Sequence, residues 1–336
     1  MNRVAIVVLN WNGIEDTLLC LDSLIAQDYK DFQIIVIDNG SVDDSVVRLE
    51  EYLAHTDFPI ELICEPKNTG FAGGVNIGIR RALESGVDGV ALFNNDAIAD
   101  QKWLSSLVNA MKNEKIGITT GLLLHQDGKT IDSTGDWFSI WGLPFPRNRG
   151  DLAASAPNSE FVFSGSGGAS LYRTTLLEDI GLFDEAFFAY YEDVDLSFRA
   201  QLAGWRVFYT PDAIAYHQQG ATSSKLHGFG VYQTFKNLPL LFLKDVPTST
   251  LLPVGSRFYL AYWLILLNAI KKGMGLYAIK GLFVSFILGF GALRKRVTIQ
   301  RNKRVSTTYI KGMFWNDLPP TQPGIRKFRK LFTGRP

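Results

Sequence analysis

Hydrophobic runs alternate with helical patterns over the first third of the chain. Four runs have no helical period, as expected of strands buried on both faces of a parallel sheet: residues 3–9, 32–37, 60–64 and 87–93. The helical patterns begin with Leu18, Leu21, Leu24 and Ile25 on one face and continue over residues 43–54, 71–84 and 102–113. Four strand-then-helix units predict a doubly wound α/β sheet whose loops gather at one edge.

The pattern becomes less regular after this region. A strand is expected at residues 116–124, followed by a polar and aromatic stretch at 125–160. So long a connection in a compact domain suggests a functional loop. Beyond it we expect one strand-like segment, two helices and two closing strands, at residues 161–172, 174–180, 192–203, 205–209 and 213–217.

Polar residues follow the predicted strands at the edge where open α/β folds bind ligands. They are Asn10, Asp38 and the triplet Asn94-Asn95-Asp96, which could hold a metal or a phosphate. The triplet could equally be a turn that caps the next helix. The glycine-rich stretch at 70–76 lacks the Lys-Ser/Thr of a P-loop and does not fit G-x-G-x-x-G, so a dinucleotide site is poorly supported.

The most acidic and aromatic stretch covers residues 181–199. Within it, Glu192 and Asp193 begin a helix, where they could simply act as caps or provide a semi-buried general base. Asp195 and Arg199, four residues apart, could pair on the helix surface. His217 ends a strand, a place where a histidine is more often structural than a metal ligand.

The length and the cysteines set broad limits. A chain of 336 residues allows one large domain or two ordinary ones. Its first apolar run is too short for a secretory signal, so no signal peptide is expected. Cys20 and Cys64 lack partners at metal-ligand spacing and are expected to be free thiols of a cytoplasmic protein.

Charge is distributed unevenly along the chain. Residues 271–336 hold fifteen Lys and Arg against Asp317 alone, a net of +14, while residues 1–270 carry −13. The stretches 258–270 and 282–293 are apolar and end in basic residues, but each is shorter than the ~20 residues that span a bilayer. We therefore expect helices docked on an anionic membrane surface, with a soluble helical subdomain as the alternative. Helices this apolar fit nucleic acid poorly.

Five motifs in order resemble the family 2 inverting glycosyltransferases of the GT-A fold, most closely the bacterial branch with rhamnosyltransferases of cell-wall and O-antigen assembly. The resemblance covers about residues 3–220. The motifs are Val7-Val8-Leu9-Asn10-Trp11-Asn12-Gly13, Val36-Ile37-Asp38-Asn39-Gly40-Ser41, Asn68-Thr69-Gly70-Phe71-Ala72, Asn94-Asn95-Asp96, and residues 181–204 with Glu192, Asp193 and Arg199.

The resemblance implies a nucleotide-diphosphate sugar donor. The residues it assigns to donor binding are Asn10, Trp11, Asn12, Asp38, Asn68, Gly70, Asn76, Asn94, Asn95 and Asp96. It also implies a divalent metal, Mg²⁺ or Mn²⁺, at the diphosphate. Asn94 stands where the family has a first carboxylate, but Asp96 alone can serve, because such cations often need only one or two carboxylates plus phosphates. His217 would be a further metal ligand and would suit Mn²⁺ better.

The resemblance further implies that Asp193, with Glu192 beside it, takes the proton of the acceptor hydroxyl in one inverting displacement. The branch suggests L-rhamnose from dTDP-rhamnose and a saccharide or lipid-linked saccharide acceptor in cell-surface polysaccharide synthesis. A non-catalytic carbohydrate-binding or scaffold protein and a sugar nucleotidyltransferase remain alternatives. The predicted organisation is a catalytic GT-A domain at 1–225 and a helical, basic, membrane-associating region at 226–336, peripheral or monotopic on the cytoplasmic face.

Overall fold

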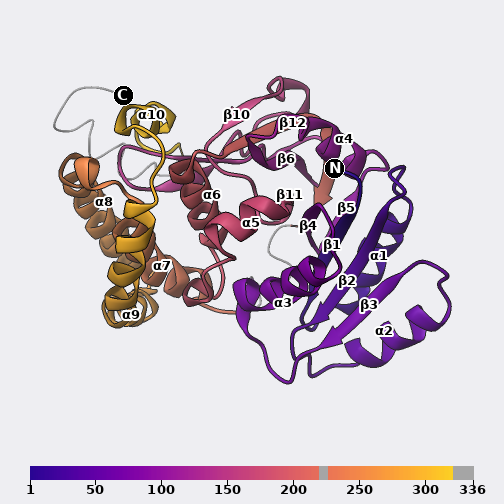
Figure 1. Ribbon diagram of the computed structural model, residues 1–336. Helices are drawn as coiled ribbons and strands as arrows, with labels where there is room; N and C mark the ends of the chain where they lie inside the picture. Colours follow the sequence, from indigo (N-terminus) through magenta and orange to yellow (C-terminus); the bar gives the residue numbers. More distant parts are fainter. Residues whose placement is uncertain (219–225, 321–336) are drawn as a thin grey trace.

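The computed structural model describes residues 1–218 and 226–320 of the chain. Its centre is a mixed sheet whose first four strands run parallel (Figure 1). In the spatial order β4-β1-β2-β3 they are Gly89–Asn94, Val4–Asn10, Phe32–Asp38 and Ile60–Cys64. Asn10 and Asp38 are direct neighbours in the register of β1 and β2. The predicted doubly wound α/β sheet, with its polar loops at one edge, is confirmed.

The other half of the sheet mixes directions. Strand β11 (Ala169–Arg173) lies antiparallel between β4 and β6 (Ile116–His125), and β12 (Arg206–His217) runs parallel to β6. Shorter strands extend this half: β5 (Ala97–Ala99), β7 (Ile131–Ser133) and β10 (Glu160–Val162). A separate hairpin pairs β8 (Asp136–Phe138) with β9 (Pro144–Pro146).

Three predicted segments differ from the structure. Residues 161–172 form two strands, β10 and β11, which lie apart in the sheet. The two strands expected at 205–209 and 213–217 form one strand, β12, because a bulge between Tyr209 and Ile214 absorbs the interruption between them. The stretch interpreted as a long loop, 125–160, contains β7, β8 and β9.

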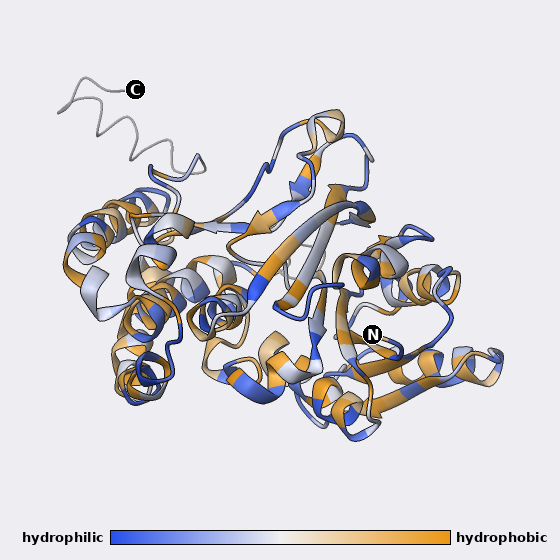
Figure 2. Cartoon of the chain, turned by 45° about the horizontal axis from the view of Figure 1, so that its top comes forward, coloured by the Kyte–Doolittle hydropathy of each residue, from blue (hydrophilic) through white to orange (hydrophobic). Residues whose placement is uncertain are grey.

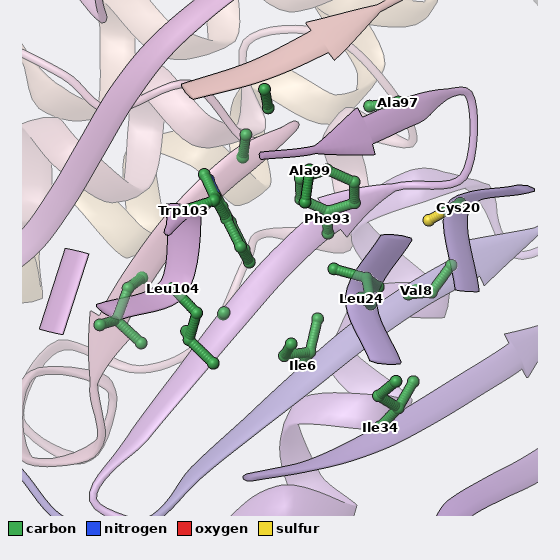
Figure 3. Packing of buried hydrophobic residues seen from close by; sticks show 14 of the residues in the cluster. Ile6, Val8, Cys20, Leu24, Ile34, Phe93, Ala97, Ala99, Trp103 and Leu104 are labelled. Atoms are coloured by element: carbon green, nitrogen blue, oxygen red, sulfur yellow. The ribbon is translucent and has the colours of Figure 1, made fainter. Parts of the chain in front are cut away.

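Helices cover both faces of the parallel half, because successive strand residues point to opposite faces. On one face Ile6 and Val8 of β1 pack with Phe93, beneath α1 (Ile14–Ile25) and α4 (Trp103–Ala110) (Figure 3). Helix α2 (Ser45–Ala54) contributes Leu49 to the same core. On the other face Val7 packs with α3 (Gly70–Glu84), in the core that also includes residues of α5 (Thr174–Ile180) and α6 (Glu192–Ala203).

The C-terminal helices gather at the end of the molecule away from β3 and α2 (Figure 1). They are α7 (Phe229–Asp245), α8 (Leu251–Lys271), α9 (Gly275–Arg301) and α10 (Thr307–Met313). The boundary predicted at residue 225 and the basic residues Arg326, Lys327, Arg329, Lys330 and Arg335 lie outside the described residues.

Helices α8 and α9 are longer than predicted, because they continue through Arg257 and Lys280, which the apolar runs exclude. In the described part of the chain, two helices are long and apolar enough to cross a membrane by length and composition, Thr248–Lys271 and Gly275–Arg301. The expectation that they are too short to span was therefore wrong. Figure 2 shows hydrophobic residues along these helices, interrupted by hydrophilic ones.

Candidate active site

The neighbouring ends of β1 and β2 carry a buried polar pair. Asn10 Nδ2 donates to Asp38 Oδ2 at 2.7 Å, and Asn10 Oδ1 accepts from the Thr17 hydroxyl at 2.8 Å. Asp38 Oδ1 accepts from the N–H of Ser41 at 2.9 Å. The Thr17 oxygen also accepts from Asn95 Nδ2 at 2.9 Å, which connects this pair to the turn after β4. Asn10 and Asp38 therefore fix the shapes of the loops around them.

Asn12 connects the loop after β1 to the loop after β2 by two hydrogen bonds. Its N–H donates to Ser41 Oγ at 2.9 Å, and its Oδ1 accepts from the N–H of Val42 at 2.8 Å. Asn12 takes a φ of 51°, a left-handed conformation that asparagine tolerates. Trp11 is half-buried in the same turn. The residues predicted to hold the base and ribose, Trp11, Asn12 and Asp38, thus lie together.

Asn39 joins a third loop to these two. Its Nδ2 donates to Asn68 Oδ1 at 3.1 Å, and its Oδ1 accepts from the N–H of Thr69 at 3.0 Å. Gly70 begins α3 with a φ of +79°, and a Cβ there would overlap the carbonyl and the ring of Phe188. Only glycine allows this approach, so the loop at 68–70 lies directly against the segment that precedes α6.

The turn after β4 lies against the end of β12. His217 Nε2 is 3.1 Å from Asp96 Oδ1 and 3.4 Å from Asn94 Nδ2. On the other side of the ring, His217 Nδ1 is 2.8 Å from Asp132 Oδ2 of β7. The structure thus brings together the two residues predicted as metal ligands. It adds Asp132, which the sequence interpretation missed.

The two carboxylates set the charge of this histidine. Burial by itself lowers the pKa of His217, but hydrogen bonds to Asp132 and Asp96 raise it to about 9. Burial opposes ionisation of Asp132, yet His217 and Arg149 outweigh it and lower the pKa of that carboxyl. Arg149 Nη2 lies 2.9 Å from Asp132 Oδ1. At neutral pH His217 is therefore protonated, with one ring nitrogen facing Asp96 and the other facing Asp132.

This donor set fits a divalent cation. Asp96 offers a carboxylate beside an imidazole nitrogen of His217, and Asp132 orients the imidazole from its opposite nitrogen, as carboxylates behind metal-binding histidines commonly do. Two protein ligands leave positions for phosphate oxygens and water. Across residues 1–218 and 226–320, no group of three or more His, Cys, Asp or Glu is arranged so that all its members could hold a metal ion. With so few protein ligands, metal affinity without nucleotide should be weak.

Two adjacent glycines connect this region to the predicted base. The N–H of Gly167 donates to Asp193 Oδ2 at 2.9 Å, and the carbonyl of Gly168 accepts from the N–H of Asn94 at 2.8 Å. A Cβ on Gly167 would lie 3.2 Å from Asp193 Cβ, and one on Gly168 would lie 2.9 Å from Asn94 Nδ2. Asp193 and the Asn94-Asn95-Asp96 turn therefore contact the two halves of one glycine pair.

Three carboxyl groups, Glu192, Asp193 and Asp136, have raised pKa values in this region. Burial and the neighbouring Asp193 raise the pKa of Glu192 to about 8. Burial also raises the pKa of Asp193, against the hydrogen bonds from Gly167 and Val194 that favour its ionised form. The pKa of Asp136 is raised well above its usual value by burial and by Asp193. Because like charges this close cannot all ionise, at least one of the three holds a proton at neutral pH.

Asn76 lies apart from these groups. Its Nδ2 donates to the carbonyl of Phe183 at 2.9 Å and to Glu185 Oε1 at 3.0 Å, while its Oδ1 accepts from the N–H of Phe183. It lines a cavity with Arg80 and Lys295 that includes none of the other predicted site residues. Its amide is fully engaged in holding α3 to the segment before α6.

The predicted pair of Asp195 and Arg199 forms, at 2.9 Å, but its expected place on the helix surface was wrong. Asp195 is fully buried and the Arg199 side chain is 8% exposed. The reason is that α7 covers this face of α6 and adds Lys244, which bonds both Asp195 and Asp184. The pair is part of a buried charge cluster.

Sequence reasoning missed Asp132, Asp136, Gly167 and Gly168. The two aspartates lie in short strands within the stretch interpreted as a loop, and nothing local marks them. The glycines were visible as a run of small residues between strand-like segments, which is the usual sign of a close backbone approach.

Comparison with solved structures gives the class of fold. The chain aligns over 99% of its length with 88% of a mannosyltransferase, PcManGT from Pyrobaculum calidifontis in complex with GDP-Man and Mn²⁺, at a TM-score of 0.56 and 16% identity. It aligns with 94% of S. aureus TarS 1-349 over 95% of its own length, at a TM-score of 0.54 and 14% identity. These likenesses confirm the GT-A fold.

The family follows from the sequence. The model described as "Glycosyltransferase like family 2" matches residues 2–229, and the chain belongs to that family. It is 24% identical over 243 residues to the low-salt glycan biosynthesis hexosyltransferase Agl10 of Haloferax volcanii, covering 70% of this chain and 74% of the relative. It is 24% identical over 224 residues to the dTDP-rhamnosyl transferase RfbF of Shigella flexneri, covering 63% and 71%. The protein is thus a glycosyltransferase of glycan or polysaccharide synthesis.

Proposed function

We propose that this enzyme is a metal-dependent inverting glycosyltransferase that transfers L-rhamnose from dTDP-rhamnose to a saccharide or lipid-linked saccharide of a cell-surface polysaccharide. The observation that carries the proposal is the glycine pair at 167–168, whose backbone contacts both Asp193 and the turn holding Asp96. A leaving-group site and a base must converge for transfer. The donor sugar rests on the likeness to RfbF.

Asp96 and His217 would hold the cation, either Mn²⁺ or Mg²⁺, with Asp132 orienting the imidazole. The PcManGT structure, which contains Mn²⁺, supports this choice. When bound, the cation neutralises charge that develops on the leaving diphosphate. Asn94 is neutral, so its amide can donate a hydrogen bond to a phosphate oxygen without adding charge to the metal, whereas the Asn95 amide already donates to Thr17 and shapes the turn.

Asp193 would accept the proton of the acceptor hydroxyl. Two backbone N–H groups, of Gly167 and Val194, keep its carboxylate oriented and favour its ionised form. Glu192, with its pKa raised to about 8, holds a proton near neutrality, which removes one like charge from beside Asp193. Attack from the face opposite the leaving diphosphate inverts the anomeric carbon in a single displacement.

We further propose that α8 and α9 dock the enzyme on the cytoplasmic face of an anionic membrane without crossing it. Both helices expose large apolar side chains, among them Tyr259, Phe283, Phe286 and Phe290. Along its length α9 packs on α7, from Gly281 against Tyr232 to Arg296, which donates to the carbonyl of Leu243. Since α7 carries the buried ions of the catalytic body, a spanning α9 would draw those ions into hydrocarbon, at high cost.

A thermal-shift screen tests the donor first. UDP, GDP and dTDP, and their sugars, are added with and without Mn²⁺, and dTDP-rhamnose with Mn²⁺ is expected to give the largest shift. Release of dTDP and an inverted product by NMR would complete the assignment. Release of pyrophosphate from a sugar phosphate and a nucleoside triphosphate would instead indicate a nucleotidyltransferase, and binding without turnover would indicate a scaffold.

A further inference from the structure

Helix α7 binds the backbone of the segment just before α6, the helix that begins with Glu192 and Asp193. Lys236 Nζ donates to the carbonyl of Phe187 at 2.9 Å and to that of Ala186 at 3.2 Å. Asn237 Nδ2 lies 2.9 Å from the carbonyl of Phe187 and 2.8 Å from those of Ala189 and Tyr190. Both side chains are buried. Two side chains of one helix thus bind four backbone carbonyls within residues 186–190, a segment that begins in the short 3₁₀ helix Glu185–Phe187.

The segment is strained where these bonds hold it. Phe188, Tyr190 and Tyr191 take positive φ angles of 62°, 69° and 71°. This conformation is unfavourable for any residue with a Cβ, and aromatic side chains gain nothing locally from it. The strain therefore requires contacts from outside the segment, and α7 provides them.

The position of the segment links both sides of the site. On the donor side, the carbonyl of Phe188 accepts from the N–H of Ala72 at 3.1 Å, and Gly70 abuts the Phe188 ring. On the other side the segment continues directly into Glu192 and Asp193. Its backbone therefore sets the separation between the loop at 68–70 and the predicted base.

Lys236 also acts on the charge of this region. It favours the ionised form of Glu192, and burial lowers its own pKa to about 8. Burial and two carboxyls of its own helix, Asp193 and Asp195, act on Glu192 in the opposite sense.

We propose that Lys236 and Asn237 are positioning residues for glycosyl transfer, so that α7, which lies beyond the match to the family model except for its first residue, is part of the catalytic framework. They hold the segment at 187–191 so that Asp193 lies at the right distance from the bound donor. The proposal rests on the proposed function for its kinetic test. It predicts a loss of turnover without a loss of nucleotide binding.

Asn237→Asp is the sharpest variant, because it keeps the shape of the side chain and replaces the two amide hydrogens by an oxygen that faces carbonyls. Release of dTDP from dTDP-rhamnose should slow about 10-fold to 100-fold, the range expected when a reacting group is displaced by about 1 Å. The dissociation constant of dTDP with Mn²⁺, measured by calorimetry, should change less than twofold. Asn268→Asp, on the exposed face of α8, is the matched control.

Lys236 gives a second test with a conservative rescue. Lys236→Met should lower kcat more than it raises the donor KM, and Lys236→Arg should recover part of kcat because it can still donate to both carbonyls. Lys112→Met, at an exposed lysine just beyond the end of α4, should match the wild type. Equal losses in kcat and in nucleotide affinity, or no rescue by arginine, would overturn the positioning role.

Amide hydrogen exchange of the full chain decides the case if a variant is poorly folded or the wild type turns over no tested donor. In Asn237→Asp, and in the milder Asn237→Ser, peptides covering 186–193 should exchange faster while peptides from β1 to β4 stay protected. Unchanged exchange at 186–193 would overturn the inference. A wild type inert toward every sugar nucleotide would count against the proposed function instead.

Discussion

The two sides of the site are held together by different forces. On the donor side, neutral amides and hydroxyls such as Asn10, Thr17 and Asn39 bond one another within consecutive β-α units. On the side of the base, α6 lies among buried ions and strained backbone, with Lys244 between Asp184 and Asp195. Neutral hydrogen bonds each contribute about 1 kcal/mol, whereas a buried ion without its partner costs several.

This contrast indicates how each side responds to change. The donor side is assembled locally, so its loops keep their shape when one bond is lost. The side of the base depends on segments far apart in the chain, from β8 through α7 to α9, which meet at α6. Substitutions there should affect both catalysis and folding, and the following experiments are designed to separate these effects.

The largest effect is expected where the two sides meet. Asp96→Ala removes the carboxylate proposed to hold the cation at the diphosphate, so turnover should fall by at least about 10³-fold, the equivalent of several kcal/mol of charge stabilisation. Nucleotide binding should lose its dependence on Mn²⁺. Calorimetry with dTDP checks this, with the exposed Asp57→Ala as control. Unchanged affinity in the presence of Mn²⁺ would contradict the assignment.

Asp193→Asn keeps the shape of the side chain and its place beside Gly167 but removes the base. Turnover should fall by about 10² to 10⁴, the usual contribution of a general base, while donor binding survives. Glu192→Gln and Asp136→Asn should be milder, because neither group contacts the glycine pair through a side-chain bond. If one of them is inactive and Asp193→Asn is active, the wrong carboxyl has been assigned.

The free energy of unfolding should distinguish the two sides of the site more directly than kinetics does. Lys244→Met leaves Asp184 and Asp195 without their shared cation inside the protein, and the free energy of unfolding should fall by about 3–5 kcal/mol. Arg48→Met, which breaks the exposed pair with Glu15 on the donor side, should leave stability almost unchanged. Urea unfolding of both variants checks the comparison. Similar losses of unfolding free energy in Lys244→Met and Arg48→Met would contradict the distinction between the two sides of the site.

The same contrast explains what the sequence could predict. The strands β1 to β4, and the grouping of Asn10, Asp38 and Asp96 at their ends, follow from local hydrophobic pattern and the rules of parallel sheets. Asp132 and Gly167 were not predictable in this way, because their importance arises only when β7 and the 163–168 segment come beside β12 and α6. Pairing between distant segments leaves no periodic signal.

The helix that carries the base shows the same limit. Sequence spacing correctly paired Asp195 with Arg199 but placed them on the surface, because nothing in α6 itself indicates that α7 will cover it. Likewise, the lengths of α8 and α9 were underestimated because Arg257 and Lys280 interrupt the apolar runs without interrupting the helices.

Glu192 predicts a pH dependence of stability on this side. Its pKa is raised to about 8, whereas the unfolded chain loses that proton near pH 4.3. Between these values the folded state binds more protons, so the free energy of unfolding falls as the pH rises. The lowered pKa of Lys236 acts only above about pH 8, in the opposite sense.

Glu192→Gln removes this titration and keeps the shape of the side chain. The melting temperature of the variant, relative to wild type, should therefore rise between pH 5 and pH 8, by roughly 2 °C or more. Calorimetric scans at both pH values measure the difference. Glu114→Gln, at an exposed position, should show no such trend. A relative melting temperature that is flat or falls with pH would mean that Glu192 is ionised in the folded protein.

The smallest effect is expected at the C-terminal helical end, which we propose docks on a membrane and where many charges are exposed rather than buried. Of three adjacent cations in α9, Lys295 bonds Asp184 at 2.6 Å and Arg296 donates to the carbonyls of Leu243 and Val246. Changing these two would disturb the catalytic body as well as docking. Arg294 is exposed, which makes Arg294→Gln the cleaner variant.

One cation near anionic lipid contributes about 1 kcal/mol, so Arg294→Gln should weaken binding to phosphatidylserine-containing vesicles about fivefold and leave binding to neutral vesicles unchanged. Phe286→Ser, at a side chain that is 71% exposed, should weaken both. High salt should release the wild type only partly, since screening weakens the ionic contacts but not apolar insertion. Complete release by salt would reduce the docking surface to a basic patch. Protection of α9 from protease on both sides of the membrane would mean that the helix spans the bilayer.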